Sequence, residues 1–460
     1  MTRFADLLQL DRGEPARALH IVAPADWSAW LGQQSARARA AVTAHGLTGK
    51  PGNKAMLPGD AAEDWSAVLV CDEPASSPWR FASMGTFLPA GTYRVAGEIG
   101  AGALGWLLGQ YRFDRYRKAD DTAPRILLTP DAARRDETLR LAEATATVRD
   151  LVNTPASDCG PADLEVAAET LARRHAATLT VTRGDALAQG YPMIHAVGMA
   201  ATKERHPRLI ELAWGDASHP RIAIIGKGVS FDTGGLDIKP AAGMKLMKKD
   251  MGGAAHALAL AGLVMAANLP VRLHLLVPAV ENSIAGNAFR PGDVLRTRAG
   301  LTVENTNTDA EGRLILGDAL TRAGEEKPEL ILDYATLTGA ARVALGPDLP
   351  PLFSSDDALA DALLAAGTAL GDPLWRMPLW DDYDAELKSD IADLVNAPDG
   401  GMAGAVTAAL FLRRFVPRDV AWAHMDVFAW RPAAKAGRPK GGDAFGLRAA
   451  YQVLKDRYPR

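Results

Sequence analysis

The chain has 460 residues, of which 48% are hydrophobic and 23% are charged, so it can bury a sizeable core, and its length predicts two domains. Its formal net charge of -4 lacks the basic excess typical of nucleic-acid-binding proteins, and nucleic acid is not the expected partner. Its two cysteines are too few for a disulfide framework or a thiolate metal site, which favours a reducing compartment.

Residues 1–130 are expected to form a small N-terminal α/β domain. Short apolar runs such as Ala67–Cys71 and Ile126–Leu128 are separated by Pro, Gly and charged turns. Gly100–Gly105 matches the dinucleotide-binding pattern G-x-G-x-x-G, but the acid that should end a second strand is missing, which indicates a chance match. Asp6 and Asp11 interrupt the start of the chain, so no secretory signal is expected and a cytoplasmic location is favoured.

Residues 131–153 predict a connecting helix. They are rich in Ala, Leu, Arg and Glu at helical spacing, and the pattern stops before Pro155. This places a domain boundary near residue 130, with residues 154–460 as a second, larger domain.

The second domain alternates apolar β-branched runs with Ala-rich and Leu-rich helical patterns. The predicted strands are Arg221–Ile225, Leu273–Pro278, Leu330–Tyr334 and Val420–Met425. Continuous apolar strands between helices indicate a sheet covered on both faces, with ligands beyond the strand ends. Lys227 follows the first of these strands and Thr336–Gly339 follows the third. The longest apolar run, Ala257–Leu269, is shorter than the ~18 to 20 residues that span a bilayer, so no membrane association is expected.

Charged residues concentrate at two places in this domain. Asn307–Leu314 puts two carboxylates and a guanidinium within five positions at a predicted strand-to-helix turn, and the segment from Lys227 to Asp250 adds further acids and lysines. Carboxylates can bridge two cations, so these acids predict a two-metal hydrolase: they are Asp232, Asp250, Asp309 and Glu311. Lys227 could be a ligand only if deprotonated, whereas Lys239 and Arg313 would stay cationic and face the reacting group.

Each of these residues also has a purely structural interpretation. Asp250 could cap the helix toward Pro270, and Thr308 or Asp309 could cap the helix that follows. Lys248 and Lys249 are typical of a solvated face. His256 and His424 are expected in core packing. The patterns H-E-x-x-H, G-x-S-x-G and Walker A are absent, so zincin, serine hydrolase and P-loop interpretations lack support.

The same residues resemble the leucyl aminopeptidase family of cytosolic metallopeptidases, the M17 type. The family's signature octapeptide N-T-D-A-E-G-R-L is present intact at 307–314. The segments Lys227–Gly235, Asp250–Gly253 and Ala335–Ala340 agree in order and spacing, and the likeness covers most of residues 150–460. It implies a small variable N-terminal α/β domain, joined by a helix to a larger catalytic α/β domain with a central mixed, mostly parallel sheet.

The resemblance further implies a metallo-exopeptidase with two divalent ions per subunit, zinc or manganese, acting on peptides with a free α-amine. One ion would be held by Lys227, Asp232, Asp250 and Glu311. The other would be held by Asp232, Asp309 and Glu311, so that Asp232 and Glu311 bridge the pair. Members of the family assemble as hexamers, so a homohexamer is expected.

The implied mechanism uses a metal-bridging water that attacks the scissile carbonyl. Lys239 would act as the electrophile that stabilises the oxyanion, and a bicarbonate held by Arg313 would act as general base. The resemblance also assigns a set of residues to the substrate site, namely Met247, Asn307, Thr336, Leu337 and Gly339.

Three segments depart from the better-known members, two of them near the pocket that receives the first side chain. They are Asn305-Thr306, Val395–Met402 and Val427–Trp430. The resemblance therefore supports the family's reaction chemistry for this chain more strongly than the family's preference for leucine. Two alternatives remain: a hexameric DNA-binding or scaffolding protein, as a second or sole role, and a two-metal enzyme acting on phosphoesters.

Overall fold

The computed structural model describes residues 2–61, 63–118 and 123–460, which form two compact units. The first unit contains Met1–Ala146 together with two later segments, Ala369–Gly371 and Ala433–Lys440. The second unit contains Thr147–Thr368, Asp372–Pro432 and Gly441–Arg460. The late segment of the first unit is held by side-chain packing, because the Arg438 guanidinium lies 4.2 Å from the centroid of the Trp79 ring. Each unit is therefore built from pieces that are distant in the sequence.

The first unit contains a sheet whose strand order is β1-β6-β5-β2-β4-β3, with only the β3 and β4 pair antiparallel among the described strands. Its strands are β1 (Leu8–Leu10), β2 (Arg17–Val22), β3 (Lys54–Pro58), β4 (Trp65–Val70), β5 (Gly91–Ala96) and β6 (Arg125–Thr129). Its helices are α1 (Trp27–Gly32), α2 (Ala36–Ala44), α3 (Met84–Phe87) and α4 (Gly102–Gly109). Trp106 of α4 is fully buried in the core of this unit, so the glycine-rich segment there is a packed helix.

The long helix α5 (Ala132–Asn153) carries the chain from the first unit to the second. The second unit is built on a sheet of order β16-β15-β18-β14-β9-β11-β8-β7, with β10 paired to β11. These strands are β7 (Thr178–Arg183), β8 (Arg208–Trp214), β9 (Arg221–Gly226), β10 (Gly228–Asp232), β11 (Arg272–Asn282), β14 (Leu330–Ala335), β15 (Pro351–Ser354), β16 (Trp375–Arg376) and β18 (Ala421–Asp426). Two small sheets pair β12 (Val294–Arg296), β13 (Thr302–Glu304) and β17 (Leu394–Val395), and β19 (Trp430–Arg431) with β20 (Gly441–Gly442).

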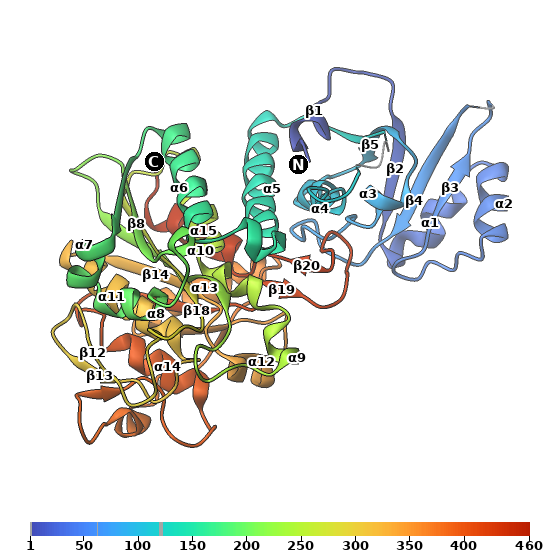
Figure 1. Ribbon diagram of the computed structural model, residues 1–460. Coiled ribbons are helices and arrows are strands. Elements are labelled where there is room, and N and C mark those ends of the chain that lie inside the picture. Colours follow the sequence, from blue (N-terminus) through green and yellow to red (C-terminus); the bar gives the residue numbers. More distant parts are fainter. Residues whose placement is uncertain (1, 62, 119–122) are drawn as a thin grey trace. The chain divides into compact units, whose positions relative to one another are not determined.

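Helices cover both faces of the large sheet (Figure 1). Besides α5, the α-helices described in the second unit are α6 (Pro161–His175), α7 (Gly184–Gly190), α8 (Pro192–Gly198), α9 (Ala241–Met244), α10 (Gly252–Ala266), α11 (Glu311–Glu325), α12 (Gly339–Leu345), α13 (Asp357–Ala369), α14 (Gly404–Arg413) and α15 (Leu447–Arg457). In β9, Ala223 and Ile225 pack into the cluster that contains α11, while the alternate residues Ile222 and Ile224 are equally buried on the other face. Successive residues of a strand point to opposite faces of the sheet. Because both faces are covered here, the buried positions of β9 are apolar on both sides, which explains the uninterrupted apolar run.

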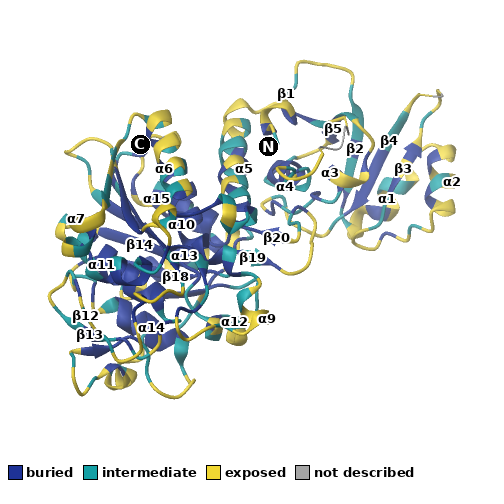
Figure 2. Cartoon of the chain, in the orientation of Figure 1, coloured by how far each residue is buried: buried dark blue, intermediate teal, exposed yellow. Residues whose placement is uncertain are grey.

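The central strands of the second unit are accordingly dark blue in the burial view, and the exposed residues are in loops and on outer helix faces (Figure 2). β9, β14 and β18 run parallel, as do β9 and β11. Their carboxyl ends therefore meet at one edge of the sheet. No helix among the described residues is long and apolar enough to cross a membrane.

The fold class predicted from the sequence is confirmed. The structure has a smaller N-terminal α/β unit and a larger unit with a mixed, mostly parallel sheet. The apolar runs predicted as strands are β9, β11, β14 and β18, and two of them lead directly into the candidate site segments at Lys227 and Thr336.

Candidate metal centre

Lys227 lies at the centre of the candidate site, between the end of β9 and the start of β10. Its backbone is fixed on two sides, because its N–H donates to Tyr334 O (2.9 Å) and its carbonyl accepts from Ala254 N (2.8 Å). The helices α10 and α11 approach it closely through glycines. A Cβ on Gly312 would come within 2.6 Å of Lys227 Nζ, and one on Gly253 within 2.7 Å of Lys227 N. These two positions therefore exclude a side chain.

The Lys227 ammonium lies between two carboxylates. Its Nζ is 2.7 Å from Asp250 Oδ2 and 2.8 Å from Glu311 Oε1, and all three side chains are at most 3% exposed. Asp250 comes from the 3-10 turn Met247–Met251, and Glu311 is the first residue of α11. Three segments that are distant in the sequence thus deliver one cation and two acids to the same point.

Lys239 makes a second cluster on the other side of Glu311. Its Nζ lies 2.8 Å from Asp232 Oδ2 and also contacts Asp309 Oδ1. Ligand atoms of Asp232, Asp309 and Glu311 all lie within 4.8 Å of one another, so the two clusters join. All five predicted metal ligands and Lys239 are therefore brought together, from the junction of β9 and β10, the end of β10 and the loop after it, the turn before α10 and the octapeptide.

The acids of this cluster repel one another. Burial, followed by the charge of Asp232, raises the pKa of Glu311 to about 8, and the same two causes raise the pKa of Asp309 to about 6. Burial would also raise the pKa of Asp250, but Lys227 and Lys249 outweigh it and hold that pKa below its usual value. The lysines therefore do not neutralise the four carboxylates fully, and added positive charge would stabilise the cluster.

The donor set fits divalent ions. Asp250 Oδ2 and Glu311 Oε1 are buried and accept no hydrogen bond from any described residue, although Lys227 Nζ is close to both. The Lys227 ammonium instead donates to Thr336 O at 3.2 Å. Carboxylate oxygens are ligands that divalent cations prefer, and a buried oxygen with a free lone pair can bind one.

Lys239 and Arg313 differ in their surroundings. Burial opposes the charge of Lys239, but Asp232 and Glu311 outweigh it and raise its pKa, so Lys239 stays cationic. Burial lowers the pKa of Arg313 to about 10. Its Nη1 donates to Asn396 O (2.7 Å), while its buried Nε has no hydrogen-bond partner among the described residues. An anion would satisfy that donor.

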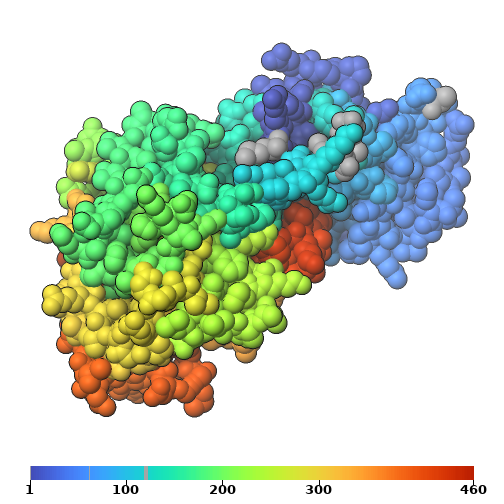
Figure 3. Space-filling model, viewed as in Figure 1, coloured from blue at the N-terminus to red at the C-terminus, as the bar shows by residue number. Residues whose placement is uncertain are grey.

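The alternative that Asp250, and Thr308 or Asp309, are helix caps is wrong. Ala310 is the N-cap of α11 and Met251 that of α10, and neither makes a side-chain cap. Thr308 instead ties two loops, because its N–H donates to Asp237 Oδ2 (2.7 Å) and its hydroxyl to Gly234 O (2.5 Å). In the space-filling view the yellow-green segment around residue 240 and the yellow segment around residue 300 lie side by side (Figure 3).

The residues assigned to the substrate site surround this cluster from several elements. Thr336 is buried and its hydroxyl donates to Asp250 Oδ1 (2.8 Å), while the N–H of Leu337 donates to Asp426 Oδ1 (2.8 Å). Gly339 is exposed at the start of α12, Met247 is 8% exposed in the 3-10 turn, and Asn307 is exposed with its Oδ1 accepting from Asp309 N. Thr336 directly contacts one predicted ligand, Asp250.

Sequence reasoning missed the residues that hold the ligands. Asn282 Nδ2 donates to Asp232 Oδ1 (2.9 Å) and to Thr308 O (3.1 Å), so it joins the two acid-bearing loops. Asn396 Oδ1 accepts from Thr306 N (2.8 Å), and its Nδ2 donates to Asn305 Oδ1 (2.8 Å). Two of the segments noted as departures are thus bonded to each other. The only available signal was position, since Asn282 ends an apolar strand.

The interpretation of Lys249 as part of a solvated face is wrong. Its side chain is 1% exposed, and its Nζ lies 3.2 Å from Asp250 Oδ1. Burial lowers its pKa. The neighbouring Lys248 is half-buried and donates to Asn153 O. His256 and His424 are packing residues as predicted: His256 contacts Gly252 O and Phe445 N through its two ring nitrogens, and His424 contacts the buried Asp333.

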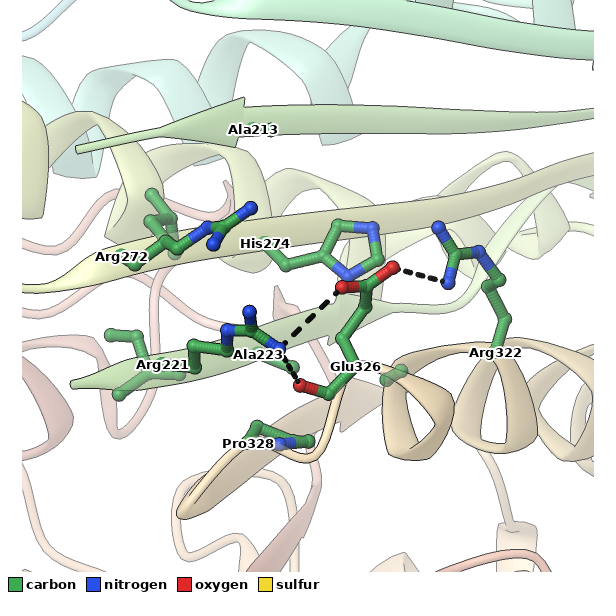
Figure 4. A pocket seen from close by; sticks show the side chains of 11 residues that line it. Ala213, Arg221, Ala223, Arg272, His274, Arg322, Glu326 and Pro328 are labelled. Carbon is green, nitrogen blue, oxygen red and sulfur yellow. Dashed lines mark hydrogen bonds and ion pairs between the residues drawn. The ribbon is translucent and has the colours of Figure 1, made fainter. Parts of the chain in front are cut away.

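A separate cavity of about 110 Å³ lies at the opposite ends of β9, β11 and α11 (Figure 4). Glu326 is drawn there between Arg221 and Arg322, with His274 beside it. Arg322 Nη1 lies 2.9 Å from Glu326 Oε1, and Arg221 Nη1 donates to Glu326 O (2.6 Å). Arginines already pair with the carboxylate in this cavity, and it contains none of the predicted site residues.

Comparison with known proteins gives a family match. Residues 146–451 match the model of the cytosol aminopeptidase family, catalytic domain, and residues 18–129 match the M17 aminopeptidase, N-terminal domain. A probable cytosol aminopeptidase from Nitratidesulfovibrio vulgaris is 44% identical over 387 residues, which cover 80% of this chain and 75% of that protein.

Solved structures give the same result. The cytosol aminopeptidase from Coxiella burnetii superposes with a TM-score of 0.94 at 43% identity, covering 99% of this chain and 100% of that one. The bottromycin maturation enzyme BotP in complex with Mn has a TM-score of 0.87 at 32% identity, covering 96% of this chain and 100% of that one.

Proposed function

The chain belongs to the cytosol aminopeptidase family, a family of metal-dependent exopeptidases, and from this premise we propose that it removes the first residue of peptides with a free α-amine at a dinuclear site. The observation that carries the proposal is the placement of Lys227 between Asp250 and Glu311, with Asp232 and Asp309 within reach of the same Glu311. One lysine and four carboxylates at one point suit two ions that share ligands.

We assign the ligands from the two clusters. Lys227, Asp232, Asp250 and Glu311 would hold one ion, and Asp232, Asp309 and Glu311 would hold the other. Two divalent ions would supply Lewis acidity, which lowers the pKa of water and polarises a peptide carbonyl. The BotP structure contains Mn, so manganese is the first metal to test, with zinc as the other candidate.

Lys239 is the electrophile in this proposal. Its ammonium is 15% exposed and stays charged beside Asp232, so it can stabilise negative charge that develops on a carbonyl oxygen above the cluster. Arg313 would hold a bicarbonate, and the chemistry that this anion supplies is that of a general base. The buried Arg313 Nε, which has no partner among the described residues, supports an anion at this place.

The test is hydrolysis of unblocked amino-acyl amides by purified protein loaded with manganese, zinc or cobalt. We expect turnover that chelation removes and metal restores. N-acetylated amides are the matched control, because a blocked amine cannot bind an ion. Equal turnover of acetylated and free substrates would contradict the proposal, as would activity confined to phosphoesters.

We also propose a cytoplasmic homohexamer, on the strength of the family alone. Light scattering after size-exclusion chromatography tests the assembly, and a monomer that retains full activity would separate the assembly from the chemistry. Salt-sensitive DNA binding that survives loss of Lys239 and Arg313 would instead support the scaffolding alternative.

A further inference from the structure

Arg342, one turn into α12, is a cation with no anionic partner among the described residues. Its guanidinium carbon lies 4.6 Å from the centroid of the Phe428 ring, and it forms no ion pair or hydrogen bond with any described residue. Its side chain is half-buried, whereas the next residue, Val343, is 90% exposed. An arginine held on an aromatic face keeps its five N–H donors available for a planar anion.

A second cation is near the same ring. Lys249 Nζ lies 5.7 Å from the Phe428 centroid and 3.2 Å from Asp250 Oδ1. Asp250 already contacts Lys227, so it is shared by two lysines. Asp250 thus already has two cationic partners, while Arg342 has no carboxylate partner among the described residues.

Arg342 is connected to the candidate site through the loop that precedes α12. Thr336 donates to Asp250, and the loop from Thr336 is held by Asp426, which accepts from Leu337 N and Thr338 N. α12 begins directly after that loop. Arg342 Nη2 would lie 3.7 Å from a Cβ on Gly339, so the guanidinium turns back toward the start of the helix.

In the proposed function the free α-amine would bind an ion, and we place it on the ion that Lys227 and Asp250 would help to hold. The side chain of that first residue must then be near Asp250, and Asp250 is joined through Lys249 and Phe428 to Arg342. A carboxylate on that side chain would meet a guanidinium that has no other anion, and its methylene groups would contact an aromatic face.

We propose that Arg342, supported by Phe428, is a specificity-determining residue that binds a substrate carboxylate, so that the enzyme favours peptides beginning with Glu or Asp. The inference rests on the proposed function and names its substrate class. A lysine at the first position is disfavoured by repulsion from Arg342. Phe428 belongs to Val427–Trp430, one of the segments that depart from the better-known members.

The test compares kcat/KM for the amides of Glu, Gln, Leu and Lys in the manganese-loaded enzyme and in Arg342→Met. The wild type should prefer Glu over its neutral isostere Gln roughly tenfold or more, as expected for a hydrogen bond between charged groups. Arg342→Met should lose that preference, while the values for Gln and Leu change less than about twofold. Arg272→Met, at the other end of β11, is the matched control and should keep the preference for Glu over Gln.

A second variant and a second pair of substrates decide between outcomes. Arg342→Glu should reverse the order of Glu and Lys, and it keeps the inference testable if Arg342→Met misfolds. If the ratio of kcat/KM for the Glu and Gln amides is unchanged in both variants, the inference is overturned. The second pair of substrates is the dipeptide Leu-Leu and its C-terminal amide. If the variants change only the ratio of kcat/KM between these two, Arg342 binds the terminal carboxylate of the substrate, and the assignment to the first residue is overturned. If the wild-type enzyme hydrolyses none of the unblocked amides, the proposed function is refuted instead.

Discussion

The two ends of β9, β11 and α11 carry charged clusters of opposite character. At the carboxyl ends of the strands, burial and neighbouring acids raise the pKa of Glu311 to about 8. At the other end, burial would raise the pKa of Glu211, yet His274 and Arg322 outweigh it and the pKa lies below its usual value. The pKa of Glu326 is also lowered, chiefly by its hydrogen bond with Arg322.

The difference separates a binding site from a structural ion-pair network. Glu211 and Glu326 have arginines as partners, so burial is compensated within the chain. Asp250 and Glu311 share Lys227, and the pKa of Glu311 stays raised because Lys227 does not outweigh burial and the neighbouring acids. Uncompensated buried charge is costly and is retained where a ligand completes it. At one end of the sheet the protein's own arginines balance the carboxylates. At the other end the carboxylates are not fully balanced and can bind divalent ions.

The largest expected effect comes from removing a shared ligand. Glu311→Gln should lower kcat/KM by more than about 100-fold, because substitutions one contact further from a metal already cost up to that much. Glu326→Gln, the same change at the opposite end of α11, should leave kcat/KM within about twofold. Activity on leucyl amide and metal content by mass spectrometry check both. Unchanged metal stoichiometry in Glu311→Gln would show that the bridging assignment is wrong.

Removal of the electrophile should be nearly as severe but should spare the metals. Lys239→Met is expected to lower kcat about 100- to 1000-fold, since Lys239 would act on charge that develops during the reaction. Metal content should stay at the wild-type level. Arg272→Met again serves as the control at the arginine-rich end. A loss that appears in KM alone would contradict the role of Lys239 in stabilising the oxyanion.

A smaller effect is expected from Asn396, which holds the octapeptide and Arg313 in place. Asn396→Ala removes its contacts with Asn305 and Thr306 and should lower kcat/KM about 10- to 100-fold, while Lys239 and the ligands stay unchanged. Steady-state kinetics at several bicarbonate concentrations check whether the loss reflects Arg313. Wild-type kinetics would show that the network is only structural.

The smallest effect on activity, and the clearest on stability, is expected at Glu211. Its folded pKa is below the unfolded value, so its contribution is present above about pH 4.5 and is lost as pH falls through the folded pKa. Glu211→Gln should cost about 1 to 2 kcal/mol at pH 7, and the deficit should vanish in acid. Thermal unfolding with chelator from pH 3 to 7 measures this. A deficit that does not depend on pH would mean lost packing.

Much of the fold and of the site followed from local pattern. Apolar runs such as Leu330–Tyr334 predicted buried strands, because a strand covered on both faces needs apolar residues at every position. The position of Lys227 directly after β9 predicted an edge-of-sheet site. The position of Lys249 did not follow, because its sequence neighbours Lys248 and Asp250 give no sign of whether a lysine is solvated or buried.

The sequence by itself determined the family, the α/β class and the residue types of the site, because these depend on spacing along the chain and on an intact octapeptide. Tertiary structure alone decided which charges meet. It buried Lys249 against Asp250, stacked Arg342 and Lys249 on Phe428, and joined Asn396 to Asn305. Charge pairing and pKa shifts depend on distances and burial created by folding, so no local pattern contains them.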